Sequence, residues 1–174
     1  MIYTSTPLPG AFVLEIEPIQ DDRGFFSYLY DGHEAEKHGL RAGAVQTKLS
    51  FNHKRGILRG MHYQAPPAAE VKLVRCTRGA VWDVIIDLRP DSPTYLKHFG
   101  VELSADNHRS LYVPKMFAHG YQTLADGTEV VYQVDEYYAP AQERGLRHDD
   151  PKVGIRWPLP VTLISKRDQA WPLL

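Results

Sequence analysis

The sequence lacks several features that direct a chain to particular classes of protein. It has one cysteine, Cys76, in 174 residues, so no intrachain disulfide or cysteine metal cluster can form. No apolar run approaches the about 18 residues of a membrane-spanning helix, and residues 1–12 do not read as a secretion signal. The formal net charge is −1, which does not favour nonspecific binding to nucleic acid or membrane surfaces. We therefore expect a cytoplasmic protein with neither kind of partner.

Helical patterns are scarce as well. The best is Gly32 to Gly39, which has room for two turns at most. The composition is globular, and the length fits one domain over residues 1–174. Short strands without a βαβ crossover predict an all-β sandwich or barrel with short peripheral helices. Besides the pair described next, the strand candidates are Phe12 to Ile16, Gly24 to Leu29, Val45 to Phe51, Gly56 to Tyr63, Leu111 to Val113, Ala118 to Leu124 and Glu129 to Glu136.

The clearest predicted pair of strands spans residues 72–88, with a turn at Arg78-Gly79, and we interpret it as a hairpin. Alternation places Lys72 on the same face as Val74 and Cys76. The cysteine is then a buried, inert thiol. Lys72 is either a strand-end residue that reaches solvent or a residue that lines a cavity.

A polar set interrupts another apolar strand, Gly56-Ile-Leu-Arg-Gly-Met-His-Tyr-Gln64. Its polar groups need partners if they are buried. Alternation puts His62 and Gln64 on one face, and Arg59 points away unless Gly60 marks a bulge that redirects it. His62 alone could equally be a core histidine satisfied by hydrogen bonds.

Three later segments add polar candidates, each weak by itself. His119 opens a strand after a proline turn, and Tyr132 has apolar neighbours on both sides. Ser165-Lys-Arg-Asp168 is a polar cluster whose default interpretation is a solvated turn. The last third is rich in proline and charge, but its apolar anchors predict that it packs back onto the strands; they are Ile155, Trp157, Leu163, Ile164 and Trp171.

Taken together, these segments resemble the dTDP-4-dehydrorhamnose 3,5-epimerase family of cupins. The resemblance rests above all on Leu-Arg-Gly-Met-His-Tyr-Gln ending at Gln64 and Phe-Ala-His-Gly ending at Gly120. It also includes Asp22-Arg-Gly-Phe-Phe26, Lys72-Leu-Val-Arg75, Asp87-Leu-Arg89, Tyr137-Tyr-Ala-Pro140, Glu143-Arg-Gly145 and Gly154-Ile-Arg-Trp-Pro158. The resemblance implies a jelly-roll cupin, a homodimer, and an enzyme without a cofactor. The enzyme would invert C3, C5 or both in a nucleotide-linked 4-keto-6-deoxyhexose, with dTDP as the expected nucleotide.

Four catalytic residues follow from the matched positions. The resemblance makes His62 the base, Asp168 its orienting carboxylate, Lys72 the stabiliser of the enolate oxygen and Tyr132 the acid on the opposite face. This assignment suits the chemistry, because a ketone at C4 acidifies the hydrogens on C3 and C5. Substrate contacts are implied for Arg23, Phe26, Gln46, Lys48, Arg59, His119 and Tyr138, some of them donated across a dimer interface.

A metal centre is the main rival interpretation, since many cupins hold one. Here the first metal motif reads His62-Tyr-Gln64, and glutamine is a poor transition-metal ligand. His62, Glu70 and His119 could form a facial triad, but ligation would prevent His62 from acting as a free base. We therefore expect no catalytic metal.

Two departures from the family pattern fall in the part that recognises the substrate. Tyr28 and Lys48 stand where other residue types are usual, and Lys48 could meet an additional anionic or hydroxyl group. Three other functions stay open from the sequence. They are a 3,4-ketoisomerase on a similar substrate, a nucleotide-sugar-binding protein without turnover, and a metal-dependent dioxygenase.

Overall fold

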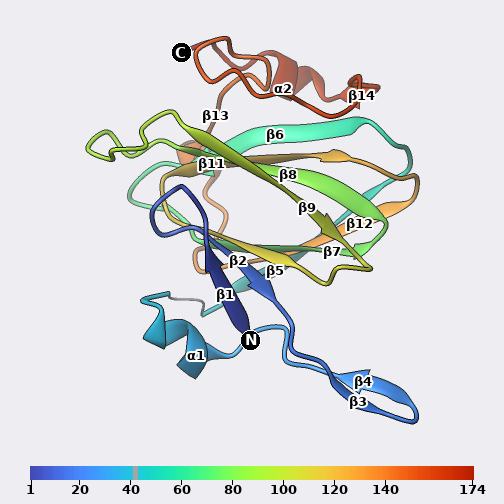
Figure 1. The fold of residues 1–174 in the computed structure, drawn as a ribbon. Helices are drawn as coiled ribbons and strands as arrows, with labels where there is room; N and C mark the ends of the chain where they lie inside the picture. Colours follow the sequence, from blue (N-terminus) through green and yellow to red (C-terminus); the bar gives the residue numbers. More distant parts are fainter. Residues whose placement is uncertain (41–42) are drawn as a thin grey trace.

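The computed structural model describes residues 1–40 and 43–174, and its two main sheets face each other as a sandwich (Figure 1). The first sheet has six antiparallel strands in the order β1-β2-β10-β7-β12-β5. This architecture, with its short helices, confirms the expected fold class. The strands of this sheet are β1 (Ile2–Ser5), β2 (Phe12–Glu15), β5 (Gln46–Asn52), β7 (Lys72–Arg78), β10 (Ser110–Val113) and β12 (Thr128–Val134).

The second sheet runs β13-β6-β11-β8-β9, with the short strand β14 added in parallel to β6. It carries the C-terminal segment, which lies above β6 in Figure 1 and includes the helical turn α2. The predicted packing of the last third onto the strands is thus confirmed. The elements are β6 (Ile57–Gln64), β8 (Ala80–Asp87), β9 (His98–Ser104), β11 (Phe117–Thr123), η1 (Pro140–Gln142), β13 (Glu143–Gly145), β14 (Leu163–Ile164) and α2 (Lys166–Gln169).

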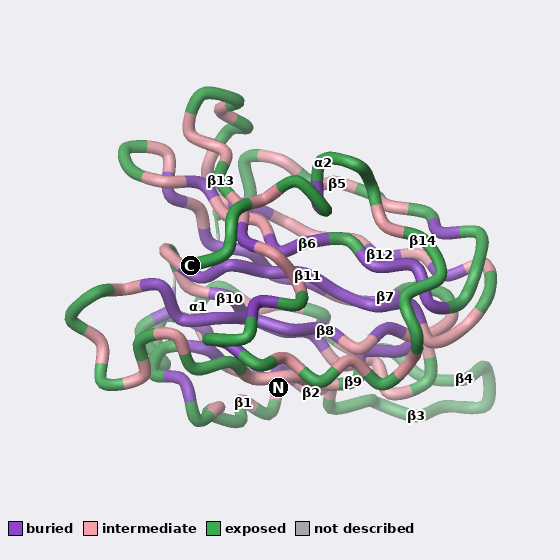
Figure 2. The backbone as a smooth tube through the Cα atoms, turned by 90° about the horizontal axis from the view of Figure 1, so that it is seen from above, coloured by how far each residue is buried: buried purple, intermediate pink, exposed green. Residues whose placement is uncertain are grey.

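The main core fills the space between the sheets. Alternation along β7 turns Val74 and Cys76 inward, and β8 contributes Val81 and Ile85. Figure 2 shows the buried positions running along the central strands of both layers. Burial raises the pKa of the Cys76 thiol to about 11, which confirms the expected buried cysteine and keeps it protonated near neutral pH.

The predicted hairpin over residues 72–88 is wrong. β7 pairs with β10 and β12, whereas β8 pairs with β11 and β9, so the two consecutive strands belong to opposite sheets. Gly79 connects them with φ +74, and a Cβ there would lie 2.6 Å from the Thr128 hydroxyl. The chain therefore crosses from one layer to the other at this glycine, and alternation alone could not reveal which strands are partners.

The helix expected near residue 32 is α1 (Gly32–Lys37), where the Asp31 side chain accepts a hydrogen bond from the Glu34 backbone N–H. Five short strands were not expected: β1, β3, β9, β13 and β14. Among the described residues, no helix is long and apolar enough to cross a membrane.

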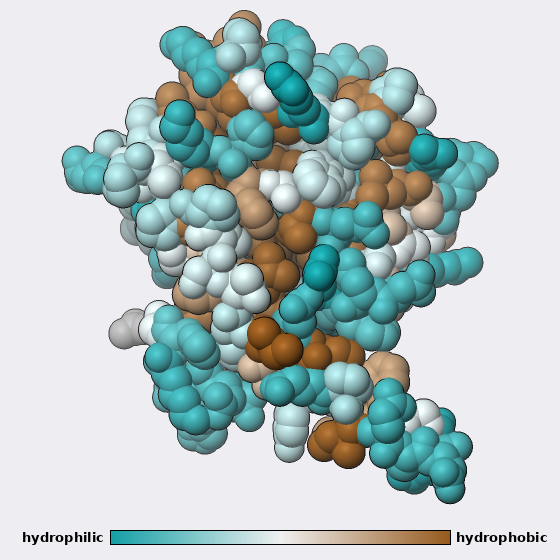
Figure 3. All heavy atoms as spheres, viewed as in Figure 1, coloured by the Kyte–Doolittle hydropathy of each residue, from teal (hydrophilic) through white to brown (hydrophobic). Residues whose placement is uncertain are grey.

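A hairpin arm of β3 (Ile19–Asp21) and β4 (Gly24–Phe26) projects from the body (Figure 1). Ile19 is 65% exposed and Phe26 61%, although both are large and apolar. Figure 3 shows apolar residues at the surface along this arm and where it leaves the body. Such exposure is typical of a surface that another chain covers.

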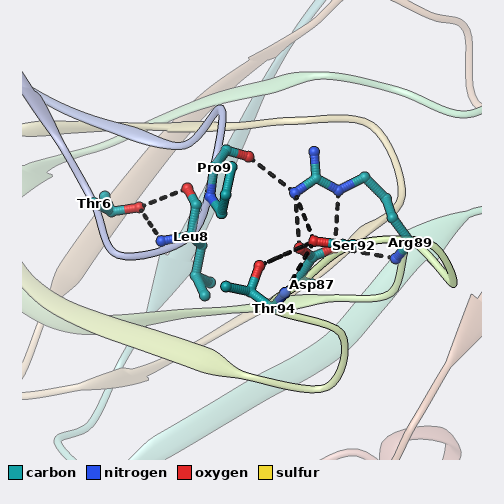
Figure 4. Close-up of polar contacts among 7 residues, drawn as sticks. All are labelled: Thr6, Leu8, Pro9, Asp87, Arg89, Ser92 and Thr94. Carbon is teal, nitrogen blue, oxygen red and sulfur yellow. Dashed lines mark hydrogen bonds and ion pairs between the residues drawn. The ribbon is translucent and has the colours of Figure 1, made fainter.

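A buried carboxylate fastens the loop after β8. Asp87 is fully buried and accepts hydrogen bonds from Arg89, Ser92 and Thr94, while Arg89 also donates to the Pro9 carbonyl (Figure 4). Burial alone raises a carboxyl pKa, but these donors outweigh it and lower the pKa of Asp87. The cluster ties the N-terminal segment to the second sheet, and we assign it a structural role.

Two glycines allow β6 and β11 to approach unusually closely. The pairing shifts register between His119 and Tyr121, which oppose His62 and Arg59 respectively. Gly60 has φ +138, and a Cβ there would lie 2.6 Å from the Gly120 Cα. Of the two alternatives that the sequence left open for Arg59, the structure has the bulge at Gly60, and Arg59 lines the same pocket as His62.

Replacing Gly60 by alanine should destabilise the fold by on the order of 2–3 kcal/mol, because alanine is strained at this φ and its methyl group meets backbone. Gly32→Ala is the matched control, since its Cβ meets only a tyrosine ring edge at 3.9 Å, and it should leave stability nearly unchanged. Urea unfolding followed by fluorescence measures both. Equal stability of the two variants would show that the close approach is not a constraint.

Candidate active site

A pocket of about 910 Å³ lies between the sheets, and the C-terminal segment covers one side of it. Its walls come from β5, β6, β7, β11 and β12, together with the residues around β13 and α2. Most of the predicted site residues meet there. Those that line the pocket are Gln46, Lys48, Arg59, His62, Lys72, His119, Tyr132, Tyr138 and Asp168.

His62 and Asp168 form a direct pair in this pocket. The distance from His62 Nε2 to Asp168 Oδ1 is 2.6 Å, and the Gly60 backbone N–H donates to the other carboxylate oxygen at 3.4 Å. Burial would raise the pKa of Asp168, but the hydrogen bonds from His62 and Gly60 outweigh it and lower that pKa. The carboxylate therefore stays ionised and holds a proton on Nε2, which leaves Nδ1 as the nitrogen able to accept one.

Local sequence explains how Asp168 reaches its position. Ser165 caps α2 by accepting a hydrogen bond from the Asp168 backbone N–H, which closes the turn. Just before it, β14 pairs with the start of β6, placing Ile164 opposite Leu58. The expected solvated turn is thus a docked helical turn whose aspartate is 3% exposed.

Lys72 is a cavity residue, the second of its two predicted alternatives. It is 7% exposed, and its Nζ forms an ion pair with the Glu70 carboxylate. Burial lowers the pKa of Lys72, and Glu70 opposes that effect.

Tyr132 lies beside Lys48 in the pocket wall. The Lys48 Nζ is 5.9 Å from the centre of the Tyr132 ring and 5.4 Å from that of Tyr138. Burial raises the pKa of Tyr132, with the nearby Tyr121 and Glu70 adding to the effect. The phenol is therefore protonated near neutral pH and can donate its proton.

Arg59 and His119 complete the polar wall on the second sheet. Arg59 Nε donates to Asn52 Oδ1 at 2.8 Å, so a neutral partner fixes the guanidinium. His119 Nε2 lies 2.9 Å from both oxygens of Asp83, a fully buried carboxylate. Burial raises the pKa of Asp83, and the contact with His119 opposes that rise.

A second set of polar contacts lies at the rim of the pocket. The Tyr138 hydroxyl donates to Glu143 at 2.7 Å, and Arg167 donates to the same carboxylate oxygen at 2.9 Å. Gln46 accepts from the Tyr138 backbone N–H, which joins the start of β5 to the loop after β12. The hydrogen bond to Glu143 raises the pKa of Tyr138.

Two predicted site residues do not reach this pocket within one chain. Arg23 sits at the tip of the β3–β4 arm, where its side chain is 89% exposed and bonded to Asp21. Phe26 lies on the same arm, in edge contact with Tyr28. The structure therefore separates Arg23 and Phe26 from the other nine residues.

Several pocket residues were missed from the sequence. Tyr121 follows His119 by two positions in one strand, and Ser50 follows Lys48 in the same way, so alternation could have found both. No sequence pattern predicts Glu143 and Arg167, because only the tertiary fold brings their segments to the pocket.

The three residues of the rival metal triad each have a different partner. His62 contacts Asp168, His119 contacts Asp83, and Glu70 contacts Lys72. Within residues 1–40 and 43–174, no three His, Cys, Asp or Glu side chains are grouped so that they could hold a metal ion. The pocket brings together a histidine bonded to a carboxylate, a buried lysine and a protonated phenol, which suits proton transfer next to a carbonyl group.

Comparisons with known proteins agree with this chemistry. The family model described as dTDP-4-dehydrorhamnose 3,5-epimerase matches residues 5–174. A dTDP-4-dehydrorhamnose 3,5-epimerase of Shigella flexneri is 42% identical over 94% of this chain and 90% of its own length. The crystal structure of the Bacillus anthracis enzyme, solved with TDP and pyrophosphate bound, has a TM-score of 0.95 at 42% identity and covers 99% of both chains. A 3′-monoepimerase of Streptomyces bikiniensis in complex with dTDP-quinovose has a TM-score of 0.88 at 31% identity, covering 98% of this chain and 86% of its own.

The tautomer of His62 can be tested without any substrate. At a pH where the ring is neutral, nitrogen-15 NMR should show the proton on Nε2, and Asp168→Asn should weaken that preference, because the carboxylate that holds it is gone. His119 should keep its Nε2 proton in the same variant, because its partner is Asp83. A neutral His62 protonated on Nδ1 in the wild-type protein would contradict the proposed geometry.

Proposed function

The chain belongs to the dTDP-4-dehydrorhamnose 3,5-epimerase family, and we propose that His62, Asp168, Lys72 and Tyr132 carry its reaction. It is an isomerase, a 3,5-epimerase of dTDP-4-keto-6-deoxy sugars in deoxysugar biosynthesis. The observation that supports these four residues is their presence in one pocket, with His62 bonded to a buried carboxylate. One domain over residues 1–174, located in the cytoplasm, remains our prediction.

His62 begins the reaction by taking a proton from the carbon next to the C4 ketone. The C–H electron pair moves into the new carbon–carbon double bond, and the ketone oxygen becomes an enolate. Asp168 favours the resulting imidazolium through the hydrogen bond at Nε2. Positioned acid–base catalysis of this kind is worth about 10²–10⁴-fold.

Lys72 stabilises the enolate oxygen. Its ammonium lies in a site with little solvent, where a charge acts more strongly than in water. Tyr132 then donates its phenolic proton to the same carbon from the opposite face, which inverts the centre. The tyrosinate and the imidazolium exchange protons with solvent to restore the starting state.

The other predicted residues bind the substrate. Arg59 has neutral partners in Asn52 and the Phe51 carbonyl, so its charge is available for a diphosphate. His119 contacts the sugar through its other ring nitrogen, Nδ1, because its Nε2 is bonded to Asp83. Lys48 stands between two tyrosine rings at the rim, and with Gln46 and Tyr138 it faces the nucleotide.

The protein acts as a homodimer in this proposal, and the β3–β4 arm reaches the pocket of the second copy. The exposed apolar residues Ile19, Phe25 and Phe26 of the arm support a covering partner. In the dimer Phe26 packs against the nucleotide base, and Arg23 reaches the diphosphate.

Deuterium exchange tests the function directly. In deuterium oxide, the wild-type protein should remove the C3 or C5 proton signal of dTDP-4-keto-6-deoxyglucose, and proton NMR identifies which carbon exchanges. His62→Ala should slow exchange by at least about 10²-fold, because the base is missing. Failure of the wild-type protein to exchange either proton would refute the epimerase function on this substrate.

Mixing two inactive variants tests the shared pocket. Arg23→Ala and His62→Ala each impair every site of their own homodimers. If Arg23 acts on the partner's pocket, a mixed dimer has one intact pocket, so an equal mixture should recover up to about a quarter of wild-type activity. Recovery is measured after subunit exchange, and no recovery despite mixed dimers would show that Arg23 acts on its own chain.

A further inference from the structure

Glu70 lines the pocket beside Lys72. It comes two residues before Lys72, and the side chains of both are buried, 7% exposed for Glu70 and 8% for Lys72. One carboxylate oxygen of Glu70 contacts the Lys72 Nζ. Burying a carboxylate costs free energy, so the position of Glu70 beside a proposed catalytic lysine calls for a physical reason.

The second carboxylate oxygen of Glu70 is also held. Gln64 Nε2 lies 3.3 Å from it, and the two N–H groups of this amide are shared among that oxygen and the Ala68 and Tyr137 carbonyls. Gln64 Oε1 accepts from the Ala139 backbone N–H at 2.7 Å, which fixes the orientation of the amide. Gln64 is 3% exposed, so this support does not compete with bulk water.

The backbone between the two charged residues is fixed as well. The Val71 N–H donates to Asp135 Oδ1 at 2.7 Å, while Val134 pairs with Lys72 across the sheet. Glu70 therefore cannot easily move away from the ammonium. The arrangement is a built support with a defined geometry.

Lys72 needs such support because an isolated buried ammonium tends to lose its proton. Burial is the largest influence and lowers the pKa of Lys72; Glu70 raises it, Lys48 on β5 lowers it and Glu143 on β13 raises it. Tyr132 faces the same space from β12, and Arg59 and His119 face it from the second sheet. A neutral amine would stabilise an enolate far less than an ammonium.

We propose that Glu70 is a positioning residue that keeps Lys72 protonated and aimed at the C4 oxygen, with Gln64 holding Glu70 in place. This inference rests on the proposed role of Lys72. Glu70 itself does not touch the reacting atoms; it acts through the lysine. This carboxylate then sets the alkaline end of the pH range in which the reaction proceeds.

The pH dependence of kcat/KM for the deuterium exchange tests the inference. Without the carboxylate, Lys72 loses its proton at a lower pH, so Glu70→Gln should move the alkaline limb to lower pH. At pH 8 the activity should fall by about 10²-fold, the cost typical of losing an oxyanion donor, with partial recovery on acidification. Glu70→Asp keeps the charge and should hold the limb near its wild-type position.

Four controls accompany the pH profile. Glu129→Gln removes a carboxylate that lies on β12 outside the pocket, and it should leave the profile unchanged. Lys72→Met combined with Glu70→Gln should be no less active than Lys72→Met alone, because Glu70 acts through the lysine. Carbon-13 NMR of the Lys72 Cε follows its titration without substrate, and thermal unfolding verifies that each variant is folded.

Each result has one meaning. An unchanged alkaline limb in folded Glu70→Gln, or a loss equal at every pH, would overturn the role of Glu70 while leaving the epimerase function intact. If Glu70→Gln does not fold, a folded Glu70→Asp variant whose alkaline limb moves to lower pH, although its carboxylate is kept, would overturn it instead. Absence of exchange in the wild-type protein would reject the proposed function rather than this inference.

Discussion

The hydrogen bond between His62 and Asp168 is the contact on which the pocket depends. It joins β6 to a turn 106 residues later in the chain, so it both positions the base and holds the C-terminal segment over the pocket. Removing His62 would leave the buried Asp168 carboxylate without this hydrogen bond, and removing Asp168 would leave the ring free to adopt the other tautomer. The same interaction thus links the closure of the fold to the protonation state that the chemistry requires.

Around this pair, three basic side chains of the pocket are each matched with a carboxylate. Lys72 has Glu70, His119 has Asp83, and Arg167 has Glu143 as partners. Arg59 and Lys48 differ, since a neutral amide holds Arg59 and two aromatic rings flank Lys48. In the proposed mechanism, Lys72 and His119 with their carboxylates face the sugar, while the two cations with uncharged partners suit the diphosphate and the nucleotide side.

The sequence predicts the face on which a side chain lies where this depends only on alternation within one strand. It predicts that Lys72 shares a face with Val74, and that the direction of the Arg59 side chain depends on a bulge at Gly60. Both hold in the structure. It failed where the answer depends on which strands become partners. The pattern predicts a hairpin at Gly79, but the strands on either side of this glycine lie in opposite sheets. Glu70 was considered only as a metal ligand, because its ion pair with Lys72 and its hydrogen bond from Gln64 are visible only in the fold.

The placement of the base and the acid on opposite faces of the sugar is the central claim, and Tyr132→Phe tests it most directly. With His62 intact, the variant can still remove a proton and return one to the same face. Proton NMR in deuterium oxide should therefore show continued deuterium uptake into substrate of unchanged configuration, while inversion at the centre that Tyr132 serves falls by on the order of 10²-fold or more. Inversion at the wild-type rate at both carbons, or equal loss of exchange and inversion, would contradict a tyrosine that acts only as the acid on the opposite face.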